Sequence, residues 1–152
     1  MSKELPRQPS EDTRRAWSRL VRVEHALLTA VEGELKAAGY PPLAWYDALL
    51  ELSRAPDGML RPLDLEREML LPQYSTSRLI DRLEKAGLVK RRACPVDGRG
   101  QIVQITVGGR RLQQDMRPVY AAAIERHIGS KLSCEEAQRL AELLAKLLQP
   151  EC

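Results

Sequence analysis

Apolar positions recur every three or four residues over much of the chain, a spacing typical of amphipathic helices. The first such stretch runs from Asp12 to Ala38, where Gly39 and two prolines supply a stop signal. A helix of this length spans about 38 Å at ~1.5 Å per residue, so we expect it to project beyond a small domain. Its apolar stripe then needs a partner, either another subunit or a distant helix of the same chain.

Three shorter helices are predicted next. The first covers Leu43 to Arg54, and the second begins at Pro62, a residue favoured at the first helical position. The third lies within Leu70 to Gly87 and has two contrasting faces on a helical wheel. Its core face carries Thr76, Leu79, Ile80 and Leu83, and the opposite arc carries Tyr74, Arg78, Asp81, Arg82 and Lys85.

The period changes after Gly87. Two runs rich in β-formers, Leu88 to Ala93 and Gln101 to Val107, flank a turn that contains Asp97 and Gly98, which predicts a hairpin with a basic tip. Helical periodicity returns at residues 109–128, and a capping box at Ser133 to Glu136 opens a last helix. A helix-turn-helix followed by a basic hairpin predicts a mainly α (α+β) winged helix-turn-helix fold.

Composition and the distribution of charge indicate which kind of partner the chain binds. A chain of 152 residues with no Phe predicts one domain with an aliphatic core. The net charge of +3 is too small to indicate a nucleic-acid protein by itself. Residues 72–111, however, hold nine basic and three acidic residues, a local charge of +6 that leaves −3 for the remainder. The predicted hairpin and the helix before it therefore concentrate the positive charge.

The residue types in this region suit DNA. Small polar side chains near a helix start can bond base edges or phosphates, Tyr74 can contact a thymine methyl, and Arg78 can pair bidentately with guanine. Arg99, between two glycines, is a slim cation suited to a narrow minor groove, and Arg91 and Arg92 are placed to hold phosphates. Taken separately, the charged helix face is explained by solvation and the hairpin turn by a structural role. The consecutive order of helix, glycine and basic hairpin favours DNA binding.

Residues Ser75 to Leu112, "STSRLIDRLEKAGLVKRRACPVDGRGQIVQITVGGRRL", closely resemble the signature region of the MarR family of bacterial transcriptional regulators. The shared features are the R-L-hydrophobic-D-R-L-E helix, G-L-V, a basic strand and D-x-R in the wing. The resemblance implies one domain over residues 1–152, with dimerisation helices at 12–40 and 109–149 and a DNA-binding region at 43–108. It also implies a homodimer on a pseudo-palindromic operator, most often as a repressor.

The resemblance further implies that Asp97 braces the wing while Arg99 enters the minor groove. Pro72 stands where the family often has a Ser-like cap, so we expect the recognition helix to begin there with a ring-fixed first turn and no side-chain cap. Together these readings predict a set of DNA-binding residues: Gln73, Tyr74, Ser75, Thr76, Ser77, Arg78, Arg82, Arg91, Arg92, Asp97 and Arg99.

The sequence leaves three hypotheses for the response to a signal. Family members bind small aromatic acids between the dimer helices and the winged region, which implies a site with Trp17, His25, Trp45 and Tyr46. A small aromatic effector ranks first, no effector second, and a thiol switch at Cys94 third. A metal sensor is disfavoured because His25 and His127 are the only histidines and show no HxxxH spacing.

The remaining expectations concern location and chemical class. Three cysteines without CxxC spacing and no long apolar run predict a cytoplasmic protein with no membrane contact. No nucleophile–base pair, phosphate loop or metal cluster is evident, so we expect neither catalysis nor a cofactor. The alternative to DNA binding is a winged-helix module that docks an acidic protein through its basic face.

Overall fold

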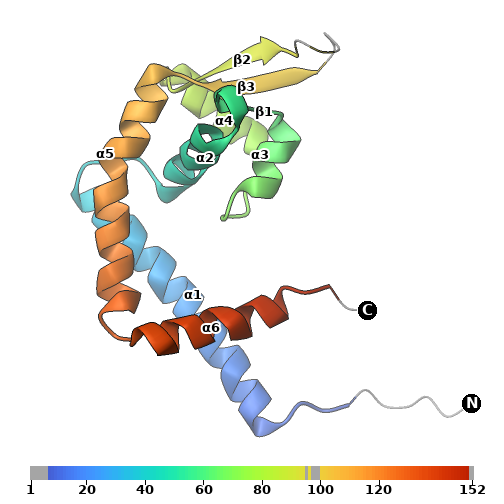
Figure 1. Ribbon diagram of the computed structural model, residues 1–152, viewed down its shortest axis with the longest axis vertical. Coiled ribbons are helices and arrows are strands. Elements are labelled where there is room, and N and C mark those ends of the chain that lie inside the picture. The colour runs from blue at the N-terminus through green and yellow to red at the C-terminus, as the bar shows by residue number, and fades with distance from the viewer. Residues whose placement is uncertain (1–6, 95, 97–99, 151–152) are drawn as a thin grey trace, which may run out of the picture.

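The computed structural model describes residues 7–94, 96 and 100–150 and places a winged helix-turn-helix head at one end of two long helices (Figure 1). The predicted mainly α winged-helix fold is confirmed. In chain order the elements are α1 (Glu11–Ala37), α2 (Leu43–Arg54), the 3-10 turn η1 (Pro56–Gly58), β1 (Met59–Leu60), α3 (Pro62–Glu68), α4 (Thr76–Lys85), β2 (Val89–Ala93), β3 (Gln101–Ile105), α5 (Val107–Ile124), the π-helical turn η2 (Glu125–Gly129) and α6 (Cys134–Leu147).

The helices begin where a side chain can accept hydrogen bonds from the free backbone N–H groups of the first turn. Ser10 accepts a hydrogen bond from Thr13 N and starts α1 one residue earlier than predicted. The N-cap of α2, Pro42, provides no capping side chain, and the Glu32 carboxylate of α1 instead accepts from Leu43 N with both oxygens, at 3.2 and 3.1 Å. This bond between elements ties the start of the head to the long helix. The predicted capping box of α6 at Ser133 and Glu136 is confirmed.

The wing is a three-stranded antiparallel sheet in the order β1-β3-β2. The short strand β1 was not predicted, since two residues show no measurable period. The second hairpin strand ends at Ile105 rather than at the predicted Val107, because Thr106 accepts from Gly109 N at 3.1 Å and caps α5. That helix consequently starts two residues before the predicted Gly109.

Two apolar clusters hold the chain together. The first lies inside the head, between α2, α3, α4 and the sheet, and includes Leu52, Leu65, Leu83 and Val103. The second joins the head to the long helices and includes Val31, Leu35, Tyr46 and Met116. Leu112 is half-buried and packs against both clusters. The head is therefore attached to the long helices by continuous packing.

Glycine is required at two places near the wing. Gly87 has a φ of +77° and ends α4, so that Leu88 N can donate to Leu83 O at 2.9 Å before the chain enters β2. Gly109, in the first turn of α5, lies so close to the wing that an added Cβ would sit 2.2 Å from Leu88 O. These glycines allow the wing to pack against the ends of both helices.

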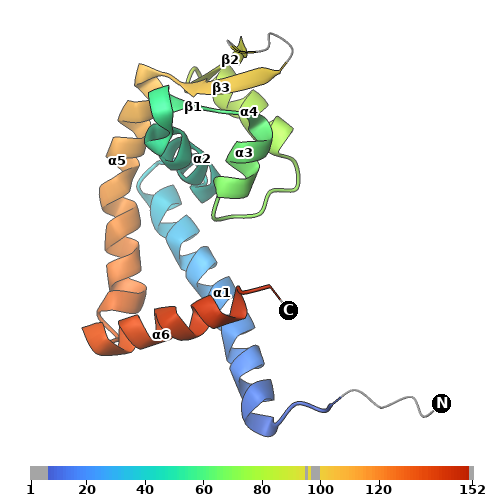
Figure 2. The ribbon, with the colours of Figure 1, turned by 45° about the vertical axis from the view of Figure 1, so that its right-hand side comes forward.

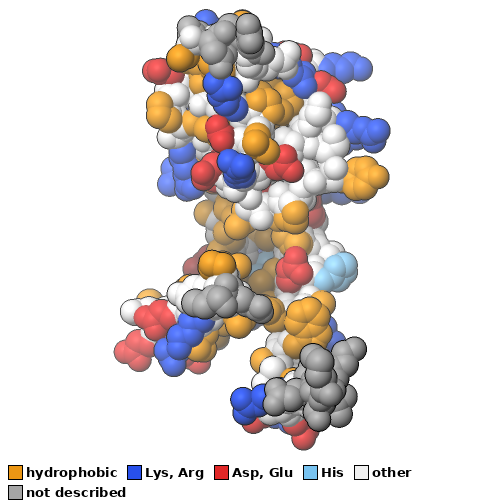
Figure 3. Space-filling view, turned by 90° about the vertical axis from the view of Figure 1, so that its right-hand side faces the viewer, with side chains coloured by type: hydrophobic (Ala, Val, Ile, Leu, Met, Phe, Trp, Pro, Cys, Tyr) orange, Lys and Arg blue, Asp and Glu red, His pale blue; other side chains and the backbone are white. Residues whose placement is uncertain are grey.

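Two arms lie at the end of the molecule far from the head: the N-terminal half of α1 runs away from the head, and α6 follows α5 and crosses the line of α1 in both views (Figures 1 and 2). Arg126 of η2 pairs with Glu34 of α1 near the base of the arms. Large apolar side chains lie exposed on both arms (Figure 3). On α1 they are Trp17, Leu20, Val21 and Val23, and on α6 they are Leu140, Leu143 and Leu147. None of the helices in the described ranges combines the length and hydropathy needed to cross a bilayer.

Candidate nucleic-acid interface

Helix α4 divides its surface into separate stripes. Thr76, Leu79, Ile80 and Leu83 are buried in the head. Arg78, Arg82 and Lys85, spaced four and three residues apart, lie exposed along another stripe. The apolar stripe anchors the helix from behind while the cationic stripe faces solvent. This arrangement presents a row of donors on a cylinder that fits a major groove about 12 Å wide.

The start of α4 differs from the prediction. Ser75 has extended backbone angles and its Oγ accepts a hydrogen bond from Arg78 N at 3.2 Å, so the helix begins at Thr76 with a side-chain cap. The expectation of an uncapped first turn at Pro72 is wrong. Pro72 lies in the loop before the cap, where Gln73 Nε2 donates to Leu71 O at 3.3 Å. Tyr74 is fully exposed in this loop, next to the outward stripe.

A buried carboxylate that sequence reasoning missed holds the loop in front of α4. Asp47 of α2 is only 5% exposed, and it accepts hydrogen bonds from Leu70 N at 3.1 Å and Leu71 N at 2.8 Å. The signal was present in the sequence, because Asp47 is the one acid among the inward positions of an otherwise apolar helix face. Asp47 thus fixes the path of the chain into the recognition helix.

Replacing Asp47 by Ala should therefore destabilise the head. Each hydrogen bond to a charged group contributes about 1.5–3 kcal/mol, so we expect Asp47→Ala to lower the free energy of unfolding by about 3 kcal/mol. Urea unfolding at one fixed protein concentration measures the change. The control is Asp64→Ala on α3, since that exposed carboxylate makes only a 4.0 Å contact with Arg67. An equal, small loss in both variants would contradict the anchoring role.

Thr76 does not belong to the exposed surface. Its side chain is 7% exposed on the core face, so the prediction that it contacts DNA is wrong for the hydroxyl. Among the described residues, Thr76 Oγ1 is a buried polar atom without a hydrogen-bond partner. The physical reason is the position itself: residue 76 shares the inward stripe with Leu79 and Leu83.

Thr76→Val should consequently stabilise the protein. Valine keeps the shape of the side chain and removes a hydroxyl whose unpaired burial costs about 1–3 kcal/mol. We expect the free energy of unfolding to rise by about 1 kcal/mol while DNA affinity stays unchanged. Chemical denaturation and a DNA titration of the same preparation measure both quantities. A less stable variant would indicate that the hydroxyl is hydrogen-bonded in solution.

The two wing arginines predicted to hold phosphates have different surroundings. Arg92 is exposed, and its Nη1 donates to Gln104 Oε1 at 2.7 Å. Arg91 is turned toward α4 instead, where Nη1 lies 2.7 Å from Asp81 Oδ1 and 3.2 Å from Glu84 Oε1. The structure thus leaves Arg92 on the surface and occupies Arg91 with carboxylates, so a phosphate contact by Arg91 is not supported. The predicted wing residues Asp97 and Arg99 lie outside the described residues.

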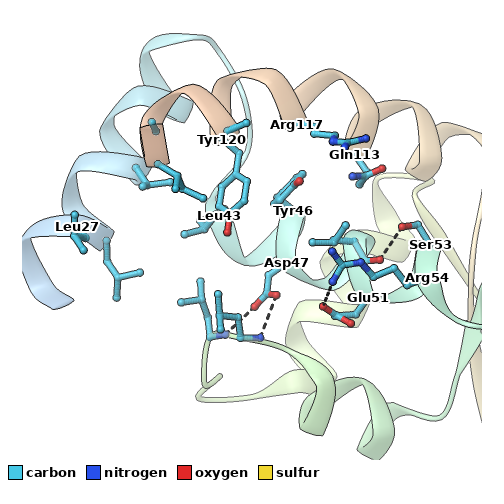
Figure 4. A pocket seen from close by; sticks show the side chains of 18 of the residues that line it. Leu27, Leu43, Tyr46, Asp47, Glu51, Ser53, Arg54, Gln113, Arg117 and Tyr120 are labelled. Carbon is cyan, nitrogen blue, oxygen red and sulfur yellow. Dashed lines mark hydrogen bonds and ion pairs between the residues drawn. The ribbon is translucent and has the colours of Figure 1, made fainter. Parts of the chain in front are cut away.

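A cavity of about 950 Å³ lies between the head and the long helices. Its walls come mainly from α1, α2 and α5, and the rings of Tyr46 and Tyr120 pack against each other in the wall with centroids 4.6 Å apart (Figure 4). Leu27 and Leu43 add apolar wall. Polar groups are present as well, among them Asp47, Glu51, Arg54, Gln113, Arg117 and His127. The cavity can thus take a ligand with an apolar body and an acidic or hydrogen-bonding end.

Burial perturbs two titratable groups of this cavity. Desolvation raises the pKa of Glu51, although the neighbouring Arg54 guanidinium acts in the opposite direction. Desolvation also raises the pKa of Tyr120, with smaller contributions from Tyr46 and Asp47. The Tyr120 hydroxyl therefore stays a hydrogen-bond donor at neutral pH. The described residues contain no group of three or more His, Cys, Asp or Glu side chains placed to hold a metal ion.

Comparison with known proteins identifies the family. A family model described as MarR family matches residues 38–100, which hold α2, α3, α4 and β2. The structure superimposes on the crystal structure of Sco3205, a MarR family transcriptional regulator from Streptomyces coelicolor in complex with DNA, with a TM-score of 0.85 and 26% sequence identity. That match covers 98% of this chain and 95% of the other. The chain belongs to the MarR family.

Two further relatives support this assignment. AbsC, a MarR family transcriptional regulator from Streptomyces coelicolor, matches with a TM-score of 0.81 and 28% identity over 93% of this chain and 95% of that chain. The HTH-type transcriptional regulator MhqR of Bacillus subtilis is 38% identical over 80 residues. Those residues are 53% of this chain and 54% of MhqR, so the chain spans about half the length of this curated relative.

The effector residues expected for a MarR-family chain are not brought together within one subunit. Tyr46 lines the large cavity, whereas Trp45 packs on the head core and lines a smaller hollow beside Tyr74 and Arg78. Trp17 is 68% exposed on the α1 arm, and His25 is exposed on the same helix. The prediction of one site containing all four is therefore wrong for the single chain. Helical periodicity could not show which face of α1 meets the head.

Cys94, the candidate thiol switch of this MarR-family chain, is 5% exposed at the end of β2. Its sulfur accepts a hydrogen bond from Arg61 Nη2 at 3.4 Å, and its backbone N–H donates to Gly100 O at 2.8 Å. Redox-sensing thiols are normally accessible to the oxidant. The burial of Cys94 thus favours a packing role over the thiol switch, which ranked third among the expected responses.

Proposed function

We propose that the protein is a DNA-binding transcriptional regulator that acts as a homodimer on a pseudo-palindromic operator, in the simplest case as a repressor. The observation that carries the proposal is the exposed cationic stripe of α4, anchored from behind by the head core and flanked by a basic wing. A relative with 26% identity over nearly the whole chain was crystallised with DNA, which supports the same partner here. Transcription regulation of this kind involves no catalysis by the protein.

The roles of individual residues follow from their placement. Arg78, Arg82 and Ser77 are exposed on α4 and are proposed to contact base edges and phosphates in the major groove. Tyr74 precedes the helix and extends toward the same groove. Arg92 is proposed to hold a phosphate beside the wing. Ser75 has a different task, because its hydroxyl already caps the helix; Gln73 lies half-buried next to it.

A second copy of the chain is the proposed partner of the two arms. The exposed apolar side chains of α1 and α6 need cover in water, and both arms lie at the end of the molecule far from the head (Figure 3). Interlocked arms would leave two heads free to bind two half-sites, the usual geometry for a symmetric operator. Residues 12–40 and 109–149 are then the dimerisation helices and residues 43–108 the DNA-binding region.

The large cavity is the proposed effector site. A small aromatic acid would place its ring beside Tyr46 and Tyr120 and its carboxylate near Arg54 or Arg117. Because Asp47 both lines this cavity and holds the loop before α4, occupancy there can change how the recognition helix is held. A cytoplasmic location, where the DNA lies, goes with this function.

Selection of bound duplexes from a random DNA pool tests the proposal. We expect one enriched, two-fold symmetric sequence, bound more weakly as salt rises because phosphate contacts release counterions. A scrambled duplex of equal length is the control, and added aromatic acids test the effector. Absence of any salt-sensitive, sequence-selective binding would overturn the proposal in favour of a winged-helix module for protein docking.

A further inference from the structure

One arginine of the wing is bound by the recognition helix through both its side chain and its backbone. Arg91 Nη1 lies 2.7 Å from Asp81 Oδ1 and donates to Glu84 Oε1 at 3.2 Å, while Nη2 donates to the carbonyl oxygen of Ser77 at 3.4 Å. The backbone N–H of Arg91 donates to Glu84 Oε2 at 2.9 Å. Glu84 therefore bridges the backbone and the guanidinium of the same strand residue.

The three acceptors lie on one stripe of α4. Ser77, Asp81 and Glu84 are spaced by four and three residues, which aligns them along the helix from its first turn to its last. The span is about 10 Å at ~1.5 Å per residue. This stripe is distinct from the outward stripe of Arg78 and Arg82. The contacts of Arg91 therefore oppose rotation and tilt of α4 against the wing without covering the outward stripe.

The local charge also argues against a phosphate contact by Arg91. Its side chain is 22% exposed and shares its site with two carboxylates, so the three groups together carry a charge of −1. A net negative cluster repels a phosphate at short range. Arg92, the next residue along the strand, is exposed and has an amide partner rather than a carboxylate. Of these two neighbouring arginines in one strand, Arg91 is thus held by the helix and Arg92 is left for a phosphate.

We infer that Arg91 is a positioning residue that, with Asp81 and Glu84, fixes the angle between the recognition helix and the wing. The inference rests on the proposed DNA-binding function. Sequence readout requires that binding side chains be held within about 0.5 Å and 10–20° of their productive geometry. An α4 held only by its apolar stripe can rock on the core. The contacts of Arg91 with Asp81 and Glu84 hold α4 and the wing in one relative orientation, so that both bind the same DNA site in one register.

Removing the two carboxylates changes DNA binding in opposite directions for the two possible roles of Arg91, phosphate contact and positioning. The double variant Asp81→Asn with Glu84→Gln deletes two negative charges beside the outward stripe and frees Arg91. If Arg91 were a phosphate contact, affinity for every duplex would rise. If Arg91 is a positioning residue, selective binding falls although the surface has become more positive.

The experiment uses the whole 152-residue chain with two probes, the duplex that the wild type selects from a random pool and a scrambled duplex of the same length. Affinities at several salt concentrations are measured for Arg91→Ala, Arg91→Lys and the double carboxylate variant. We expect the ratio of selected to scrambled affinity to fall about tenfold or more in Arg91→Ala and in the double variant, a loss the size of one base-readout contact. Arg91→Lys should recover part of the ratio because it keeps the charge.

Two controls separate positioning from phosphate binding and from general charge. Arg92→Ala should weaken both probes alike and reduce the salt slope by about 0.9, the value for one phosphate contact. Glu135→Gln with Glu142→Gln removes two charges from the polar face of α6 and should leave the ratio unchanged. Thermal unfolding of each variant shows whether it folds. If the double carboxylate variant does not fold, Glu84→Gln alone is measured in its place.

The outcomes are distinct. A double variant that binds both probes more tightly at an unchanged ratio overturns the inference, and so does Arg91→Ala with a smaller salt slope and an unchanged ratio. In both cases the wild type still selects a sequence, so the proposed function stands. A wild type that enriches no sequence overturns the proposed function itself, and the inference with it.

Discussion

Leu143→Glu in α6 is expected to convert the protein to monomers at micromolar concentration and to weaken operator binding by about 100-fold or more. Leu143 is 43% exposed on the α6 arm, in the apolar row with Leu140 and Leu147. A glutamate buried between two copies would lack a partner for its charge, which is strongly unfavourable. Loss of the dimer then removes the gain in affinity that comes from binding two half-sites at once.

Sedimentation velocity gives the oligomeric state and a titration with the selected duplex gives the affinity. Gln138→Glu is a matched control, because it changes the net charge by the same amount at an exposed position on the opposite, polar face of α6. We expect that variant to stay dimeric. A Leu143→Glu protein that remains a dimer would show that the apolar row of α6 faces something other than the second subunit.

Arg78→Ala is expected to lower operator affinity by about tenfold to a hundredfold, the range for loss of one good bidentate contact to a base. Arg78 is exposed in the first turn of α4, the part of a recognition helix that reaches base edges. Its backbone N–H is bound by the Ser75 cap, so the cap and the arginine side chain share one turn. Removal of the side chain leaves the cap in place, and we expect folding to be unaffected.

The two duplexes separate the ways in which Arg78 can act. A base contact predicts a large loss on the selected duplex and a small one on the scrambled duplex, whereas a phosphate contact predicts equal losses and a salt slope reduced by about 0.9. Arg139→Ala on α6 is the control, since that arginine pairs with Glu142 far along the chain from the head. An unchanged affinity for the selected duplex would remove Arg78 from the interface.

Local signals located most of the elements. The α2 helix has its predicted bounds, Leu43 to Arg54, because its apolar period is regular and a turn follows it. The capping box of α6 was readable as well, since Ser133 and Glu136 satisfy each other's backbone within one turn. The start of α4 was misplaced because Pro72 and Ser75 are both good helix openers, and only the hydrogen bond to Arg78 N distinguishes them.

Contacts between distant segments were beyond such reasoning. The two acceptors of Asp47 lie 23 and 24 residues from it, and nothing in the local period around α2 indicates that a loop will return there. Arg91 and Arg92 are equivalent in the sequence, yet the pleat of β2 directs one toward α4 and the other to the surface. The same limit applied to the effector residues, whose helix faces depend on how α1 packs on the head.

The sequence by itself determined the order of elements, the concentration of positive charge between residues 72 and 111, and the resemblance to the MarR family. These properties depend on residues a few positions apart, where periodicity and capping act. Only the tertiary structure decided that Asp47 anchors the loop before α4, that Thr76 is buried and that Arg91 joins the wing to the recognition helix. Those assignments depend on which side chains meet when distant segments pack, and that is set by the fold as a whole.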